Sequence, residues 1–188
     1  MKEKIQIEAR GKVKVKKIKT ILCEQGATVS SKANFEELTS RGYGTVEDKK
    51  LVLNAYETLF LLSKGLLEVS KRKPKKGLNF RELLSLYRLA DENVWVKYLI
   101  YRDLRSRGYV VREGFGLKIT FRLYERGEYS KATATYLILG IQEGKPISVK
   151  ELASVLKHVQ SLKKKLVLAV VNRRGEIVYY TLSKLTMK

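Results

Sequence analysis

The feature that most constrains the fold is a pair of neighbouring segments whose apolar patterns differ. Residues 117–124 alternate apolar with polar side chains, which predicts a strand with one buried face. Residues 133–141 are more continuously apolar, which is typical of a strand at the centre of a sheet. We therefore expect the second half of the chain to be built around a sheet.

The segments around this pair predict a mixed β-sheet flanked by helices, an α/β (α+β) fold class. An amphipathic helix is expected over residues 94–107, where Gly108 ends it. Ser148 and Glu151 have the spacing of a capping box and predict a helix that runs to about Leu162. Further strands are predicted at 109–112, 165–171 and 177–182.

The first half predicts a smaller domain of antiparallel strands and helices. Alternation over residues 5–21, broken at Gly11, indicates half-buried strands. A short helix is expected near residues 34–38. Asp48 is expected to cap a longer helix that ends at Gly65.

The middle of the chain supplies the predicted domain boundary. A strand is expected over 66–69 and an exposed loop over 71–77, and Asn79 is expected to cap a helix that ends at Ala90. The pattern changes after Asp91. The sequence therefore predicts an N-terminal domain of residues 1–91 and a C-terminal domain of residues 92–188.

The charge balance points to a polyanionic partner. The chain has 39 Lys and Arg against 19 Asp and Glu, a formal net charge of +20. A Lys-rich surface for thermostability is the alternative, but thermophile proteins balance Lys with Glu and this chain does not. The excess favours nucleic-acid binding by phosphate neutralisation, and composition does not distinguish DNA from RNA.

Several classes of protein do not fit the composition. One cysteine, Cys23, makes no internal disulfide, and with one histidine, His158, it gives no ligand set for structural zinc. No cofactor or metal is expected. No apolar run is long enough to cross a bilayer, and the N-terminal residues do not form a secretory apolar segment, so we expect a cytoplasmic protein without a membrane partner.

Four ordered segments carry a resemblance to a known family. Residues 98–111, YLIYRDLRSRGYVV, resemble the segment that opens the C-terminal domain of the archaeal tRNA-splicing endonucleases. In the family's order there follow FRLYERG at 121–127, YL at 136–137, and KKKLVLAVV at 163–171 with GEIVYY at 175–180. In the first half, RGYG at 41–44 and the helix–strand step over 57–69 resemble the family's N-terminal domain.

The resemblance implies a metal-independent RNA endonuclease that cuts pre-tRNA at the bulge-helix-bulge boundaries of introns. The RNA supplies its own nucleophile, the 2′-hydroxyl beside the scissile phosphate. One side chain removes the 2′-proton, a second protonates the 5′-oxygen leaving group, and a cation stabilises the transition state. The products are a 2′,3′-cyclic phosphate and a 5′-hydroxyl, and in the family these roles belong to a tyrosine, a histidine and a lysine.

Two of the three family positions are filled as expected. The tyrosine falls on Tyr124, and the lysine falls on Lys164, with Lys163 and Lys165 leaving the register open by one residue. Thr133 stands at the histidine position, and a threonine hydroxyl is too weak an acid to replace an imidazole. His158 lies inside the predicted helix after Ser148, where we expect a surface or partly packed residue rather than a displaced catalytic acid.

The resemblance and this departure together imply the structural subunit of a two-plus-two heterotetramer, whose partners are a catalytic subunit and pre-tRNA. Tyr124 and Lys164 would then be vestigial, an aromatic at a strand end and one cation of a solvated run. Two alternatives stay open: a self-sufficient nuclease in which His158 or a lysine supplies the proton, and a basic RNA-binding protein of the same fold.

Two segments are expected to contact other subunits. The family inserts an acidic loop into a partner. The matching residues 142–146 are weakly acidic at best, so we expect this chain to receive such a loop in a basic groove. Residues 178–182 form an apolar segment suited to pairing with the last strand of another subunit, although the same segment can pack on its own sheet.

Overall fold

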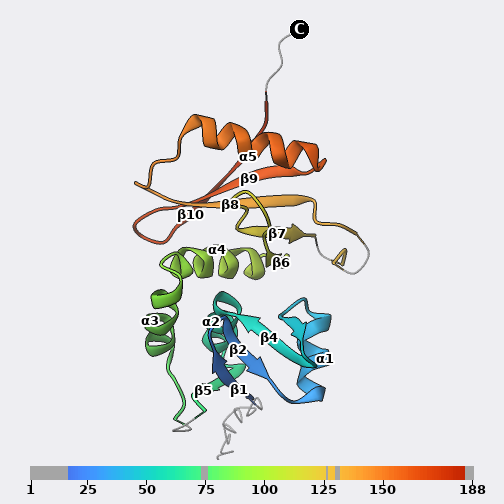
Figure 1. Cartoon of the computed structure of the whole chain (residues 1–188), viewed down its shortest axis with the longest axis vertical. Helices are drawn as coiled ribbons and strands as arrows, with labels where there is room; N and C mark the ends of the chain where they lie inside the picture. The colour runs from blue at the N-terminus through green and yellow to red at the C-terminus, as the bar shows by residue number, and fades with distance from the viewer. Residues whose placement is uncertain (1–16, 73–75, 126, 130–131, 185–188) are drawn as a thin grey trace, which may run out of the picture.

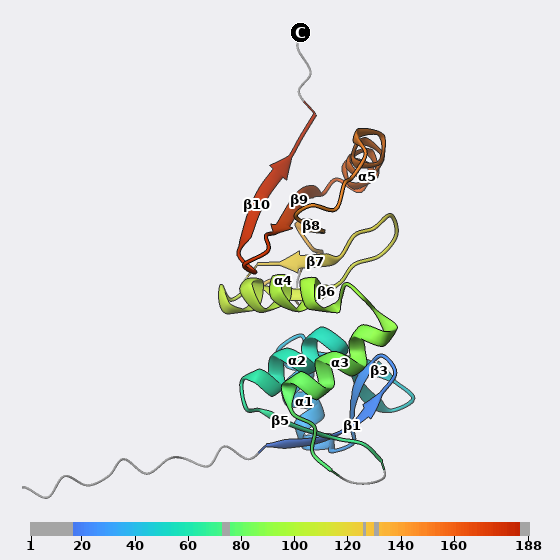
Figure 2. The same ribbon diagram turned by 90° about the vertical axis from the view of Figure 1, so that its left-hand side faces the viewer.

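The computed structural model describes residues 17–72, 76–125, 127–129 and 132–184. The two halves of the chain form two sheets at opposite ends of an elongated molecule (Figure 1). Two helices lie between the sheets: α2 (Ala55–Ser63) packs on the N-terminal sheet, and α4 (Val94–Ser106) packs between α2 and the C-terminal sheet. The view at right angles shows the same order of layers (Figure 2). None of the helices in the described part of the chain is long and apolar enough to cross a membrane.

The N-terminal sheet has the strand order β3-β4-β2-β1-β5. β1 pairs parallel with β5 and the other pairs are antiparallel, so this sheet is mixed rather than antiparallel as predicted. The predicted alternating strands over residues 5–16 lie outside the described residues. The strands are β1 (Ile18–Cys23), β2 (Gly26–Val29), β3 (Thr45–Glu47), β4 (Lys50–Asn54) and β5 (Leu67–Ser70).

The predicted helix start at Asp48 is wrong. Asp48 and Lys49 have φ angles of 46° and 62° and form the turn between β3 and β4. Leu51 and Leu53 are both fully buried because alternate residues of a strand face the same side. The spacing of apolar residues in the sequence instead predicts a helix at this point. The helix α2 (Ala55–Ser63) instead has Asn54 as its N-cap, where Asn54 and Glu57 form a capping box.

The other two helices of this half lie where the sequence predicts them. They are α1 (Lys32–Ser40) and α3 (Phe80–Ala90). Asn79 caps α3, since its side chain accepts a hydrogen bond of 3.0 Å from the Glu82 N–H. The Glu82 carboxylate in turn accepts one of 2.9 Å from the Asn79 N–H.

Replacing Asn79 by alanine is expected to lower the free energy of unfolding by about 1 kcal/mol, within a range of roughly 0.5–2 kcal/mol, because the Glu82 N–H loses its acceptor, the Asn79 side chain. Urea denaturation measures the change. Ser31→Ala is the matched control, because Ser31 precedes α1 without a side-chain capping bond and its loss should change stability little. Equal losses for the two variants would contradict this assignment.

The C-terminal sheet has the order β10-β9-β8-β7-β6, with β8 and β9 parallel and the other pairs antiparallel. α4 covers one face and α5 (Val149–Ser161) covers the other, so the predicted mixed sheet flanked by helices is confirmed (Figure 1). The strands are β6 (Val110–Glu113), β7 (Phe121–Tyr124), β8 (Tyr136–Gln142), β9 (Lys165–Val171) and β10 (Ile177–Leu182).

The strand predicted over residues 117–124 is shorter in the structure, where it covers only residues 121–124. Gly116 and Lys118 have φ angles of 66° and 55°, so the chain turns there and β7 begins only at Phe121. Ile119 packs under α5, whereas Phe121 packs in the core that contains α4. Ile119 and Phe121 are two residues apart and would share a face on one continuous strand. They pack on opposite sides of the sheet because the strand begins only after the turn.

A clamp made by the RGYG segment joins the two halves. Arg112 Nη1 of β6 donates hydrogen bonds of 3.1 and 2.6 Å to the carbonyls of Gly42 and Gly44. Arg105 of α4 lies 4.0 Å from the centroid of the Tyr43 ring. A Cβ on Gly42 would lie 2.5 Å from Val110 Cγ1, so this close approach requires glycine.

The clamp lies beside a continuous core. α2 and α4 contribute to one hydrophobic cluster that includes residues of both sheets. Because this core is shared by both halves, it does not mark a boundary between them. The domain boundary between residues 91 and 92 stays a prediction.

Candidate functional site

The three positions matched to the family meet at one edge of the C-terminal sheet. Tyr124 ends β7, Thr133 precedes β8, and Lys164 directly precedes β9. β7 runs antiparallel to β8, and β8 runs parallel to β9, so the end of β7 lies beside the starts of both other strands. The strand order alone brings the three positions together, although about forty residues of chain separate the first from the last.

The three side chains line a single pocket of about 340 Å³. Lys164 Nζ donates a hydrogen bond of 2.6 Å to Thr133 Oγ1, so the lysine contacts the residue predicted to stand at the family's histidine position. The described lining residues are Phe115, Arg122, Tyr124, Tyr129, Ala132, Thr133, Ala134, Leu137, Leu162 and Lys164.

The chemistry of this lining is basic and aromatic. Among its described residues there are two cations, Arg122 and Lys164, and no carboxylate or imidazole. No described lining side chain therefore has an ordinary pKa near neutrality. The pocket can attract and hold an anion, and it has no residue suited to give up a proton at neutral pH.

His158 is adjacent to the pocket without lining it. It lies on α5, and its Nε2 atom is buried with no hydrogen-bond partner in the described residues. The Nε2 atom lies 3.4 Å from where a Cβ on Gly116 would be, so the loop that contains Gly116 covers the ring. The histidine is partly buried against this loop.

Three residues that line the pocket were not predicted from the sequence. Phe115 lies in the turn before β7, Arg122 lies on β7, and Tyr129 lies in the loop after it. The Tyr129 ring packs edge-on against Tyr124, with ring centroids 5.2 Å apart, and the Arg112 guanidinium of the clamp lies 5.9 Å from its centroid. Phe115 and Tyr129 lie in irregular segments, where no periodic pattern of apolar residues indicates their position.

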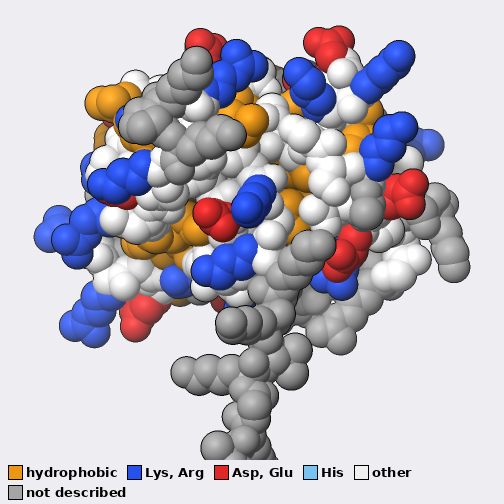
Figure 3. Space-filling view, turned by 90° about the horizontal axis from the view of Figure 1, so that it is seen from below, with side chains coloured by type: hydrophobic (Ala, Val, Ile, Leu, Met, Phe, Trp, Pro, Cys, Tyr) orange, Lys and Arg blue, Asp and Glu red, His pale blue; other side chains and the backbone are white. Residues whose placement is uncertain are grey.

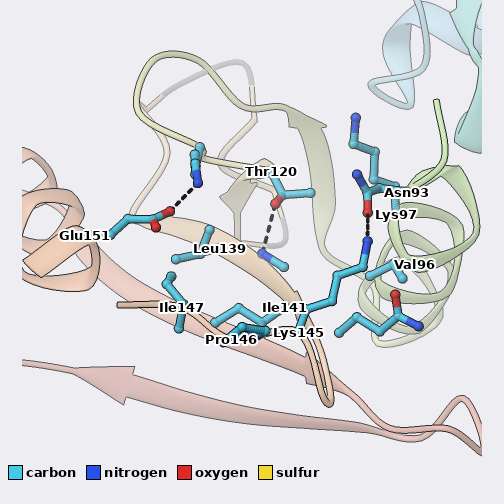
Figure 4. A pocket seen from close by; sticks show the side chains of 13 residues that line it. Asn93, Val96, Lys97, Thr120, Leu139, Ile141, Lys145, Pro146, Ile147 and Glu151 are labelled. Carbon is cyan, nitrogen blue, oxygen red and sulfur yellow. Dashed lines mark hydrogen bonds and ion pairs between the residues drawn. The ribbon is translucent and has the colours of Figure 1, made fainter. Parts of the chain in front are cut away.

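A second pocket, of about 270 Å³, lies between α4, β8 and the start of α5 (Figure 4). Three lysines line it, and each already has a carboxylate partner: Lys97 pairs with Asp91, Lys118 with Glu151, and Lys145 with Glu92. Lys145 also donates a hydrogen bond of 3.2 Å to the Asn93 side chain. The segment 142–146, predicted to contact a partner, forms part of this pocket's wall.

The basic side chains are not confined to these pockets. Seen from the end formed by the N-terminal half, Lys and Arg side chains are spread around the molecule, with Asp and Glu among them (Figure 3). On this face the positive charge forms no single compact patch.

Comparison with known proteins identifies the class. The family model described as the catalytic C-terminal domain of tRNA intron endonuclease matches residues 94–179, and the model described as its N-terminal domain matches residues 18–84. The chain is 31% identical to a tRNA-splicing endonuclease of Methanococcus vannielii over 172 residues, which is 92% of this chain and 97% of the relative. It is 34% identical to that of Pyrococcus furiosus over 142 residues, 75% of this chain and 80% of the relative.

The chain belongs to the tRNA-splicing endonuclease family. The C-terminal match includes Tyr124, Thr133 and Lys164, the three positions that meet in the pocket.

Proposed function

We propose that this chain is the structural subunit of a tRNA-splicing endonuclease that cuts pre-tRNA at bulge-helix-bulge intron boundaries and leaves 2′,3′-cyclic phosphate and 5′-hydroxyl ends. The observation that carries the proposal is Thr133, which stands at the family's histidine position in a pocket where Tyr124 and Lys164 remain. The relatives named as tRNA-splicing endonucleases support the reaction, and the missing histidine supports the structural role.

The chemistry explains why this one replacement decides the role. Cleavage by the 2′-hydroxyl needs a group that takes a proton, a group that gives one and a cation. A threonine hydroxyl does not protonate a leaving oxygen at neutral pH, and loss of a general acid costs about 10²- to 10⁴-fold in rate. A catalytic subunit must then supply the complete sites, and this chain positions that subunit and adds basic surface for the RNA.

We place this chain in a cytoplasmic two-plus-two heterotetramer, with its last strand as one subunit contact. β10 pairs only with β9 among the described strands, so one edge of it is open. Val178 and Tyr180 on this strand are 50% and 53% exposed. An apolar strand with an open edge is suited to pairing with a strand of another subunit.

The double variant Val178→Asp with Tyr180→Asp is expected to weaken association at least tenfold, because two charges would be buried at the strand pairing. Light scattering coupled to size-exclusion chromatography measures the mass of the assembly. Val46→Asp is the matched control, since Val46 is 52% exposed on β3 of the N-terminal sheet and should leave the mass unchanged. An unchanged mass for the double variant would show that β10 is not a subunit contact.

The partner's acidic loop is a second contact that we propose for the pocket between α4 and α5. Lys97, Lys118 and Lys145 line this pocket and make it basic. Because each lysine already has a carboxylate partner, an incoming acidic loop would exchange one ion pair for another. This contact is therefore expected to add specificity more than affinity.

The direct test is cleavage of a labelled bulge-helix-bulge RNA in EDTA, first by the purified chain and then with its catalytic partner added. We expect no cleavage by the chain alone and cleavage at both boundaries with the partner. Efficient cleavage by the chain alone would assign it to the catalytic subunits. If the chain binds RNA without associating with a catalytic subunit, it is a basic RNA-binding protein of this fold.

A further inference from the structure

Phe115 is exposed in a pocket whose other features suit a nucleotide. Its side chain is 50% exposed, so part of the ring is open to a ligand in the pocket. The Arg122 guanidinium lies 5.3 Å from the ring centroid, and Arg122 Nε is fixed by a hydrogen bond of 2.9 Å to the Glu113 carbonyl. An aromatic ring next to a cation is the arrangement with which proteins hold the bases of single-stranded RNA.

The loop that carries Phe115 is held in place at several points. A Cβ on Gly114 would lie 1.9 Å from the Ile119 carbonyl oxygen, so the backbone is packed tightly there. Lys118 is paired with Glu151 of α5. Because these contacts already order the loop, binding of a base on Phe115 would not have to offset the entropy cost of ordering the loop.

Lys164 places a cation in the same pocket. Its ammonium group donates to Thr133 and has no carboxylate partner in the described part of the chain. A neutral hydroxyl leaves the lysine's charge uncompensated, so it stays available to an anion. The pocket thus combines a stacking ring, a cation for phosphate, and a volume at the lower end of the range for small ligands.

We propose that this pocket binds one unpaired nucleotide of the RNA without cutting it, with the base stacked on Phe115 and the phosphate at Lys164. The proposal rests on the function proposed above and deepens it, because the pocket that lacks a proton donor becomes an RNA-holding site. Arg122 holds Phe115 in place and adds positive charge. Phe115 and Arg122 are then specificity residues for an unpaired position in the RNA.

The test uses the full-length chain and a bulge-helix-bulge RNA in which 2-aminopurine replaces an unpaired base. Stacking on an aromatic ring is expected to quench the 2-aminopurine fluorescence. Phe115→Ala is expected to abolish the quenching and to raise Kd roughly 5- to 150-fold, the range for loss of one stacked base. Phe115→Trp should keep both the quenching and the affinity.

Leu117→Ala is the matched control, since Leu117 lies two residues away in the same loop, is 49% exposed and does not line the pocket. It should change Kd less than twofold. Lys164→Gln should lower the slope of log Kd against log salt concentration by about one, as expected for one lost phosphate contact, and Phe115→Ala should leave this slope unchanged.

The outcomes separate this inference from the proposed function. If Phe115→Ala and Leu117→Ala bind equally well and quenching persists in both, the nucleotide site is wrong, even where the chain with its partner still cuts RNA. If the chain with its catalytic partner neither binds nor cuts the RNA, the proposed function itself is wrong.

Discussion

Replacing Thr133 by histidine is expected to give the chain cleavage activity, with a gain of about 10²- to 10⁴-fold over the unmodified chain on a bulge-helix-bulge RNA. Tyr124 and Lys164 already line the pocket, and Lys164 Nζ lies 2.6 Å from Thr133 Oγ1, so an imidazole at this position would join them. Thr133 is exposed, so the larger ring displaces no core side chain. The measurement is the rate of strand cleavage in EDTA, with detection of a 2′,3′-cyclic phosphate end.

Two further variants show whether the gain comes from proton transfer. Thr133→Gln adds a polar side chain that does not titrate and should stay inactive. Adding Tyr124→Phe to Thr133→His should remove most of the gain, because the pocket loses the hydroxyl matched to the family's tyrosine. If the folded Thr133→His variant stays inactive, the family roles do not carry over to Tyr124 and Lys164.

Replacing Arg112 by alanine is expected to lower the free energy of unfolding by about 3–5 kcal/mol, because it removes the guanidinium that pairs with the buried Glu57 carboxylate. Glu57 is almost fully buried, and Arg112 Nη1 lies 3.8 Å from its Oε1. The same guanidinium holds Gly42 and Gly44. In a chain of this size the loss corresponds to a fall in Tm of roughly 6–20 °C, measured by calorimetry.

The pH dependence provides a second readout for this clamp. Burial raises the pKa of the Glu57 carboxyl, although N–H groups of Asn54 and Gly44 and the charges of Arg112 and Arg105 act against the rise. A raised carboxyl pKa favours the folded state below the unfolded pKa, and this contribution is lost as the pH rises through the folded pKa. Removing Arg112 raises the pKa further, so the destabilisation should be smaller at about pH 5 than at about pH 8.

Arg41→Ala is the matched control for Arg112→Ala. Arg41 lies in the same segment, but its ion pair with Glu37 is exposed at both side chains. Exposed ion pairs contribute about 0–1 kcal/mol to stability, so this variant should have nearly the same free energy of unfolding as the unmodified chain. A loss for Arg112→Ala no greater than for Arg41→Ala would mean that the clamp does not hold Glu57.

The sequence predicted best where a local signal and the burial period agreed. The helix capped by Asn79, the helix after Ser148, and the last two strands lie where capping residues and apolar runs placed them. The predictions were wrong at Asp48 and over residues 117–120. In both places the chain turns at residues with positive φ, among them the non-glycine residues Asp48, Lys49 and Lys118, and the spacing of apolar residues does not reveal such a turn.

By itself, the sequence determined the family, the mixed sheet flanked by helices and the absence of histidine at position 133, because these depend on residue identity and local periodicity. Only the tertiary structure decided which distant residues meet. It joined Tyr124, Thr133 and Lys164 through strand order, brought Phe115 and Tyr129 to the same pocket, and placed Arg112 against the RGYG segment. These contacts depend on how strands pair and loops pack across long stretches of chain, which no local pattern in the sequence records.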